Sequence, residues 1–130
     1  HDKSRCASTP VDNLESLYTN SEYKNANYVF INEAQFFNNL YNFCLTTVEK
    51  YKKHVVVFGL DGDYQRKPFG EILKLVPLAN SVTKLPALCK LCGDGTPGLF
   101  TKRIVNKCQQ ILIGGEDMCQ AVCRKHYMEI

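Results

Sequence analysis

Two short cysteine motifs in the C-terminal part of the sequence could bind a metal ion. Cys89 and Cys92 form a C-x-x-C motif, and Cys123 and His126 form a C-x-x-H motif. Two such turns supply the four sulfur and nitrogen ligands that Zn²⁺ prefers in closed structural sites. The alternatives are four unrelated buried residues or a redox C-x-x-C motif, and no thioredoxin-like βαβ pattern frames the latter. We therefore predict one structural zinc ion with no open position for catalysis.

A second candidate site lies where two apolar runs end in acidic residues. Glu33 follows the run at 28–31, and the sequence Asp-Gly-Asp at 61–63 follows the run at 54–60. Ligands of open parallel sheets bind beyond the carboxyl ends of the strands, so Glu33 could act as a general base toward a hydroxyl group. The alternatives are a helix capped by Asn32 with Glu33 in its first turn, and an ordinary Asp-Gly turn.

The hydrophobic pattern predicts the elements that position these residues. Continuous apolar runs at 28–31 and 54–60 indicate parallel strands covered on both faces, and an apolar stripe over 34–52 indicates a helix between them. This is a βαβ unit. We also expect the following elements: a helix starting at the Ser-Thr-Pro signal of 8–10, a polar connection over 19–27, a helix over about 69–77, a strand over about 81–88, and paired strands at 99–105 and 109–113. The expected fold is α/β with a small β part organised by cysteines, divided near residue 84.

Composition restricts the class of protein. The chain has 130 residues, enough for one ordinary domain. Sixteen Lys and Arg against 13 Asp and Glu leave a net charge of +3, which is too weak to indicate a nucleic-acid partner. The apolar runs are far too short to span a membrane. The chain has seven cysteines, an odd number, so disulfide bonds cannot pair all of them. This indicates a reducing compartment, and we expect a cytoplasmic protein.

Longer motifs resemble a known enzyme family. They are Phe-Ile-Asn-Glu-Ala-Gln-Phe-Phe at 30–37, Leu-Asp-Gly-Asp-Tyr-Gln-Arg-Lys-Pro-Phe-Gly at 60–70, Leu-Val-Pro-Leu-Ala at 75–79, Thr-Lys-Arg at 101–103 and Ile-Gly-Gly-Glu-Asp at 113–117. With the cysteine motifs, their order and spacing resemble the type II, zinc-containing thymidine kinases over about residues 28–127. The resemblance implies a P-loop-type parallel sheet, with 1–84 as a partial nucleotide-kinase core and 85–130 as a zinc-binding lasso subdomain.

The resemblance also implies an activity and a set of partners. Members of that family transfer the γ-phosphate of ATP to the 5′-hydroxyl of thymidine with Mg²⁺, usually as homotetramers, and feedback binding of dTTP is compatible with this. Glu33 matches the general base, and the zinc ligands match the four residues named above. The positions that match substrate-binding residues are Phe36, Leu60, Tyr64, Thr101, Arg103, Gln110, Leu112, Gly114 and Cys119. No membrane or nucleic-acid partner is expected.

Three departures from the family pattern qualify this expectation. The Gly-rich phosphate loop is absent, so we expect an N-terminal stretch to be missing and the 130 residues alone to be inactive. Asn32 stands where the family has an Asp that helps to hold Mg²⁺, and Cys119 stands where the family has a Tyr. Two alternatives follow: a catalytically impaired, kinase-like nucleotide-binding or assembly subunit, and a zinc-ribbon nucleic-acid binder, which the charge and the acidic strand ends disfavour.

Overall fold

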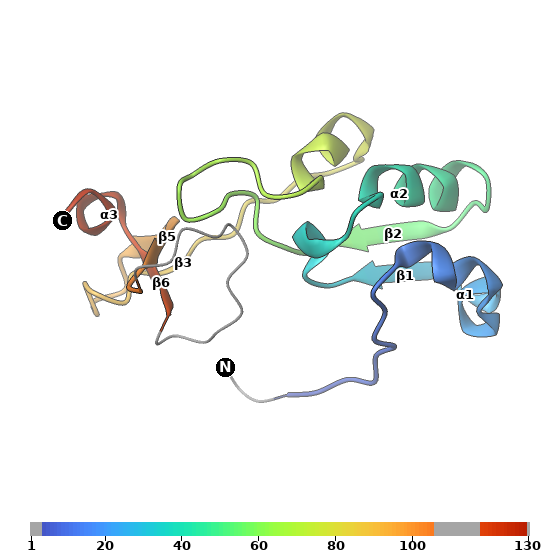
Figure 1. Cartoon of the computed structure of the whole chain (residues 1–130), viewed down its shortest axis with the longest axis horizontal. Helices are drawn as coiled ribbons and strands as arrows, with labels where there is room; N and C mark the ends of the chain where they lie inside the picture. Colours follow the sequence, from blue (N-terminus) through green and yellow to red (C-terminus); the bar gives the residue numbers. More distant parts are fainter. Residues whose placement is uncertain (1–3, 106–117, 130) are drawn as a thin grey trace.

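A parallel pair of strands and a group of short antiparallel strands lie at opposite ends of the molecule (Figure 1). The structure is a computed structural model, and it describes residues 4–105 and 118–129. In chain order the elements are the 3-10 helix η1 (Leu14–Thr19), α1 (Ser21–Asn25), β1 (Tyr28–Ile31), the 3-10 helix η2 (Ala34–Phe36), α2 (Leu40–Glu49), β2 (His54–Val57), the 3-10 helix η3 (Ile72–Leu78), β3 (Ala87–Leu88), β4 (Pro97–Gly98), β5 (Phe100–Arg103), β6 (Cys119–Val122) and α3 (Arg124–Met128).

The predicted βαβ unit is present. β1 and β2 pair in parallel, with Tyr28 opposite His54 and Ile31 opposite Val57. α2 connects them, and the pairing continues beyond the strands because Phe58 N donates to Ile31 O at 2.9 Å. The carboxyl ends of both strands therefore meet at one edge of the sheet.

The core lies between one face of this sheet and the helices before and after β1. Ile31 packs in a cluster with Leu40 and Phe43 of α2, which are both fully buried. Tyr23 of α1 closes the cluster, and its buried hydroxyl shares a 2.9 Å hydrogen bond with the hydroxyl of Thr47. Residues 19–27, expected to be a polar connection, thus contribute a helix to the core, because Tyr23 is a large apolar ring with a partner for its hydroxyl.

The opposite face of the sheet carries exposed aromatic rings. Tyr28 and Phe30 are 58% and 65% exposed, and Phe58 is 49% exposed. The rings of Phe30 and Phe58 stack at a centroid distance of 6.4 Å. The prediction that both faces of the strands are covered is therefore wrong for the described residues, since the helices of this part pack on one face alone.

Several predicted boundaries differ from the structure. The expected helix over 34–52 is divided into η2 and α2, because Asn39 takes the left-handed conformation with φ 56°. The first helix begins after Asn13, whose side chain accepts a hydrogen bond from Glu15 N, and does not begin at the Ser-Thr-Pro signal. The expected helix over 69–77 is the 3-10 helix η3, which contains Pro77. Of the expected strand over 81–88, only β3 is regular.

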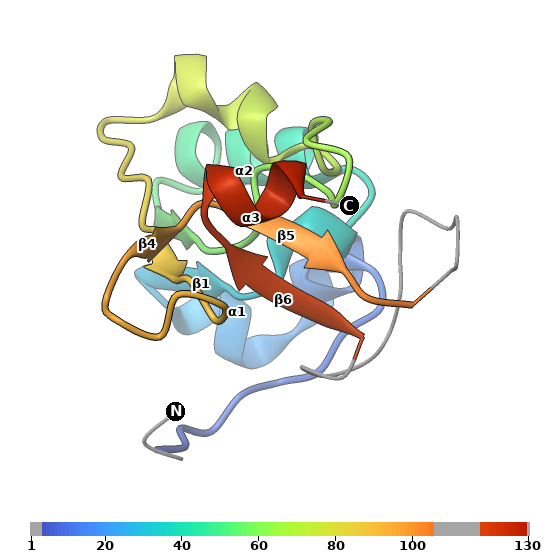
Figure 2. The same cartoon turned by 90° about the vertical axis from the view of Figure 1, so that its left-hand side faces the viewer.

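The C-terminal part consists of two small antiparallel pairs and a short helix (Figure 2). β3 pairs with β4, and β5 pairs with β6. The expected partner of the strand at 99–105 was 109–113, which lies outside the described residues; the described partner is β6. The division of the chain at residue 84 stays a prediction.

Truncating the core should destabilise the fold strongly. Phe43→Ala removes a fully buried ring, so we expect the free energy of unfolding to fall by about 3–5 kcal/mol. Denaturant unfolding followed by circular dichroism measures this change. Asn42→Ala, at an exposed position of the same helix, is the matched control, and an equal loss in both variants would contradict the assigned core.

Candidate metal centre and active site

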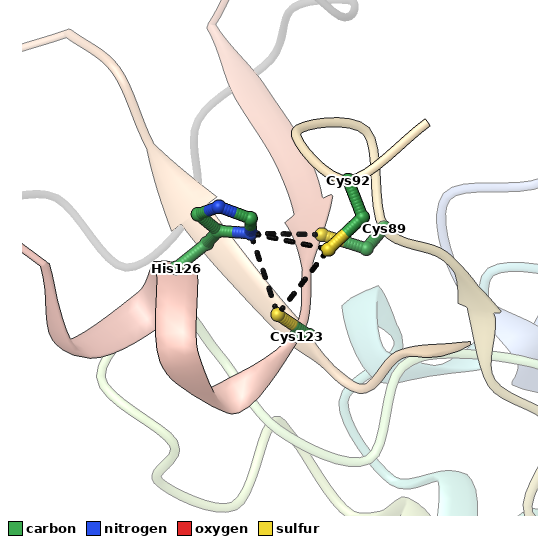
Figure 3. Close-up of side chains that lie close together, drawn as sticks. All are labelled: Cys89, Cys92, Cys123 and His126. Carbon is green, nitrogen blue, oxygen red and sulfur yellow. Dashed lines mark hydrogen bonds between the residues drawn. The ribbon is translucent and has the colours of Figure 1, made fainter. Parts of the chain in front are cut away.

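The four predicted zinc ligands converge at one point (Figure 3). Cys89 and Cys92 come from the turn after β3, Cys123 lies between β6 and α3, and His126 lies in α3. Their sulfur atoms and the histidine nitrogen all lie within 4.8 Å of one another. No other group of three or more His, Cys, Asp or Glu side chains within 4–105 and 118–129 forms such a cluster.

The distances in this cluster fit a tetrahedral zinc site. Nδ1 of His126 lies 3.4 Å from Sγ of each of Cys89, Cys92 and Cys123. Sγ of Cys92 and Sγ of Cys123 are 3.8 Å apart. Zn–S bonds of about 2.3 Å and Zn–N bonds of about 2.0 Å give tetrahedral edges of about 3.8 Å between sulfurs and about 3.5 Å between sulfur and nitrogen. These residues could therefore hold Zn²⁺, and four protein ligands would close the site.

The environment of Cys89 favours the thiolate form that a metal requires. Burial raises the pKa of its thiol, but hydrogen bonds from the backbone of Cys123 and Cys92 and from the His126 side chain outweigh this and lower the pKa to about 6. Burial and the neighbouring thiols of Cys89 and Cys123 raise the pKa of Cys92 to about 11. A bound cation would remove the remaining thiol protons, since metal binding and deprotonation are coupled.

Glu33 lies just beyond the carboxyl end of β1, as its place in the sequence indicates, and its backbone has an unusual conformation. Its backbone is left-handed, with φ 51° and ψ 42°, and it precedes η2 without a side-chain capping hydrogen bond. The helix-capping alternative is therefore wrong. The exposed side chain accepts a 2.7 Å hydrogen bond at Oε2 from Nε2 of Gln35. Asn32, which precedes Glu33, is also exposed at this edge of the sheet.

A cleft of about 240 Å³ separates the parallel-sheet part from the zinc-ligand part. It brings together Leu60 and Thr101, two of the expected substrate-binding residues. Nζ of Lys84, from the connection between the two parts, forms a 2.8 Å ion pair with Oδ2 of Asp61. The residues that line the cleft are Leu60, Asp61, Gly62, Asp63, Arg66, Pro68, Leu73, Lys84, Leu99, Phe100 and Thr101. Its lining is mixed, with apolar side chains such as Leu60 and charged ones such as Arg66.

Within the described part of the chain, the other expected substrate-binding residues do not line this cleft. Phe36 is exposed and packs edge-on against Phe69. The guanidinium of Arg103 lies 3.7 Å from the centroid of the Tyr64 ring. Cys119 is opposite Arg103 in the β5–β6 ladder. The expected lasso residues Gln110, Leu112 and Gly114 lie outside the described residues.

Comparison with known proteins identifies the family. The family model described as thymidine kinase matches residues 1–127. The chain belongs to the thymidine kinase family. A thymidine kinase of Oryza sativa subsp. japonica is 47% identical over 107 residues, which are 82% of this chain and 39% of that protein. Thymidine kinase a of Arabidopsis thaliana is 46% identical over 106 residues, 82% of this chain and 44% of that protein.

A viral relative matches over a longer range. The thymidine kinase of Myxoma virus (strain Uriarra) is 39% identical over 127 residues, which are 98% of this chain and 68% of that protein. The chain thus spans about two fifths of the length of the plant relatives and about two thirds of the viral one.

Contacts that sequence analysis missed join the two parts of this thymidine kinase family member. The guanidinium of Arg66 lies 4.6 Å from the centroid of the Tyr127 ring and 5.6 Å from that of Phe100. The Tyr127 hydroxyl donates a 2.6 Å hydrogen bond to the carbonyl oxygen of Tyr64. The sequence offers one signal for this contact: Tyr127 directly follows His126, a predicted zinc ligand. Helix α3, which carries His126 of the candidate metal cluster, therefore also contacts the turn beside the cleft.

Loss of one metal ligand should unfold the C-terminal part. We expect one zinc ion per chain in metal-replete protein, and Cys89→Ser should lower the zinc content and speed amide exchange in β5 and β6 while α2 stays protected. Elemental analysis and hydrogen exchange measure the two effects. Cys6→Ser, at an exposed cysteine outside the cluster, is the control. Absence of zinc from the metal-replete wild type would overturn the site.

Removal of the Tyr127 hydroxyl should loosen the turn beside the cleft. Tyr127→Phe keeps the ring next to Arg66 but removes the hydrogen bond to Tyr64. This loss should lower the free energy of unfolding by about 1 kcal/mol. We expect faster amide exchange over 61–68 with unchanged zinc content. Tyr51→Phe, whose exposed ring makes no hydroxyl hydrogen bond among the described residues, is the control. Equal exchange over 61–68 in both variants would show that the hydrogen bond contributes nothing.

Proposed function

We propose that the protein containing this chain is an ATP-dependent thymidine kinase that makes thymidine 5′-monophosphate for deoxynucleoside salvage. The observation that supports this most directly is the cleft that Leu60 and Thr101, two expected nucleoside-binding positions, both line. Family membership and the curated names of the relatives support the same activity. Thymidine and ATP are the proposed partners.

In this proposal Glu33 is the general base. Its carboxylate accepts the proton of the thymidine 5′-hydroxyl as the 5′-oxygen bonds to the γ-phosphorus, and the bond from that phosphorus to the bridging oxygen of ADP breaks. Such transfers depend on positioning and charge stabilisation. Mg²⁺ bound with ATP would neutralise phosphate charge, and the amide of Asn32, next to Glu33, could orient a water ligand but brings no charge of its own. Zinc would have a structural role alone.

The nucleoside site in this proposal has contributions from both parts of the chain. Phe36, Leu60 and Tyr64 supply its apolar wall from the sheet part. From the other part come Thr101, Arg103, Cys119 and the lasso residues Gln110, Leu112 and Gly114. The 3.7 Å contact between Arg103 and the Tyr64 ring means that Arg103 would have to move before a base could occupy that face of the ring.

The phosphate-binding part of the active site is proposed to belong to a larger core. Parallel sheets are covered on both faces, whereas Phe30 and Phe58 leave one face of this sheet apolar and exposed. We propose that in the functional protein further strands of a P-loop-type sheet, with the phosphate loop, extend this sheet and that their connecting helices cover the exposed face. The 130 residues alone would then bind no ATP phosphates and would be inactive.

The remaining properties proposed for the protein follow from family membership and composition. These are a homotetrameric assembly, feedback binding of dTTP, and a division into a nucleotide-kinase core (1–84) and a zinc-binding lasso subdomain (85–130). The six cysteines within the described residues form no disulfide bond, which is compatible with the proposed cytoplasmic location. Within the same residues, no helix has the length and apolar character needed to cross a membrane.

Replacing the proposed base should remove turnover but spare nucleoside binding. Glu33→Gln in the full-length protein keeps the shape of the side chain and cannot accept the 5′-hydroxyl proton, so kcat should fall about 10²- to 10⁴-fold. Conversion of thymidine to its monophosphate measures kcat, and calorimetry measures thymidine affinity. Glu49→Gln, at an exposed position of α2, is the control. Wild-type turnover in Glu33→Gln would refute the base.

The same assay separates the alternative function. If the full-length, folded and zinc-loaded wild type makes no thymidine monophosphate, the protein is better described as a nucleotide-binding or assembly subunit. Asn32 and Cys119, two of the three departures from the family pattern, favour that alternative.

A further inference from the structure

We propose that Gln35 is a positioning residue that holds the Glu33 carboxylate and the backbone of Leu60 in one fixed arrangement. The inference rests on the proposed function, in which Glu33 is the base and Leu60 lines the nucleoside cleft. Gln35 lies in η2 and is 4% exposed, although glutamine is mostly a surface residue. A buried side-chain amide requires partners, and both ends of this one have them.

The two ends of the amide contact the two strand ends. Nε2 of Gln35 donates a 2.7 Å hydrogen bond to Oε2 of Glu33, which follows β1. Oε1 of Gln35 accepts a 3.2 Å hydrogen bond from the backbone N–H of Leu60, which follows β2. The first bond is charge-assisted and therefore stronger than a neutral one. A single side chain thus links the acid at one strand end to the cleft wall at the other.

The surroundings leave the Gln35 amide little room to move. A Cβ added at Gly59 would collide with Oε1 of Gln35, and one added at Gly70 would collide with the backbone carbonyl of Gln35. Ala34 N donates a 2.9 Å hydrogen bond to Phe58 O, which fixes the start of η2 against the end of β2. Glycine therefore permits a close approach to Gln35 at two places, by Gly59 at its side-chain oxygen and by Gly70 at its main-chain carbonyl.

The consequence concerns the geometry of the base. Glu33 is exposed, so packing does not fix its side chain. The hydrogen bond to Oε2 removes this freedom, and within the described residues Oε1 makes no hydrogen bond. Oε1 is therefore the oxygen that would accept the 5′-hydroxyl proton. A base held in the productive geometry avoids an ordering cost during the reaction.

The test separates the two ends of the amide. Gln35→Glu in the full-length protein keeps the shape and an oxygen that can accept from Leu60 N, but it replaces the amide donor with a second carboxyl group, which either repels Glu33 or shares a proton with it. Gln35→Met loses both hydrogen bonds. We expect kcat to fall about 10- to 100-fold in Gln35→Glu. The thymidine affinity measured by calorimetry should stay within about twofold of wild type, a smaller change than the loss of one hydrogen bond to the nucleoside would cause. Asn42→Leu, at an exposed amide of α2, should keep wild-type kcat.

A double-mutant cycle distinguishes positioning from a general structural role. If Gln35 acts through Glu33, Gln35→Met should hardly change the residual kcat in a Glu33→Gln background, because the residue it positions is already gone. Wild-type kcat in Gln35→Glu, additive losses in the cycle, or a parallel loss of thymidine affinity and thermal stability would each overturn the inference. Failure of the proposed function would give a different result: the wild type would make no thymidine monophosphate, or Glu33→Gln would keep wild-type turnover.

Discussion

The parallel pairing of β1 with β2 is the constraint on which the candidate active site depends. Parallel strands require a crossover, and α2 supplies it while burying Leu40 and Phe43 against one sheet face. The pairing brings residues that are more than twenty positions apart in sequence to one edge. Glu33 follows the first strand, and the segment that includes Leu60 follows the second. Without the crossover packing, the acid and the cleft wall would have no fixed relation to each other.

The C-terminal part is organised by a different interaction. Its strands are two to four residues long, and Cys89 and Val122 are its buried apolar side chains among the described residues. Such a small core is insufficient for independent stability, and a metal cross-link is a common substitute. The cluster of Cys89, Cys92, Cys123 and His126 joins two separate segments of chain, 89–92 and 123–126, at one point. The metal would therefore determine the shape of the surface that faces the cleft from this side.

Sequence patterns predicted the features that depend on local spacing. The apolar runs located β1 and β2, and the C-x-x-C and C-x-x-H motifs located the metal cluster. Patterns failed where a single backbone conformation decides the outcome, as at Asn39, which divides the expected helix. They also failed for contacts between distant segments. Arg66 lies on the rings of Tyr127 and Phe100, and the spacing of these residues carries no periodic signal. The role of Gln35 likewise became visible once its two partners were placed around it.

The exposed face of the parallel sheet has a consequence for how this polypeptide behaves in a test tube. Stacked rings of Phe30 and Phe58 lie beside two strands that each have an unpaired outer edge in the described part. Flat apolar sheets with open edges are templates for strand addition by other chains. The 130 residues taken by themselves are thus prone to colloidal self-association, and charged tags or detergent would be needed to keep them dispersed during purification.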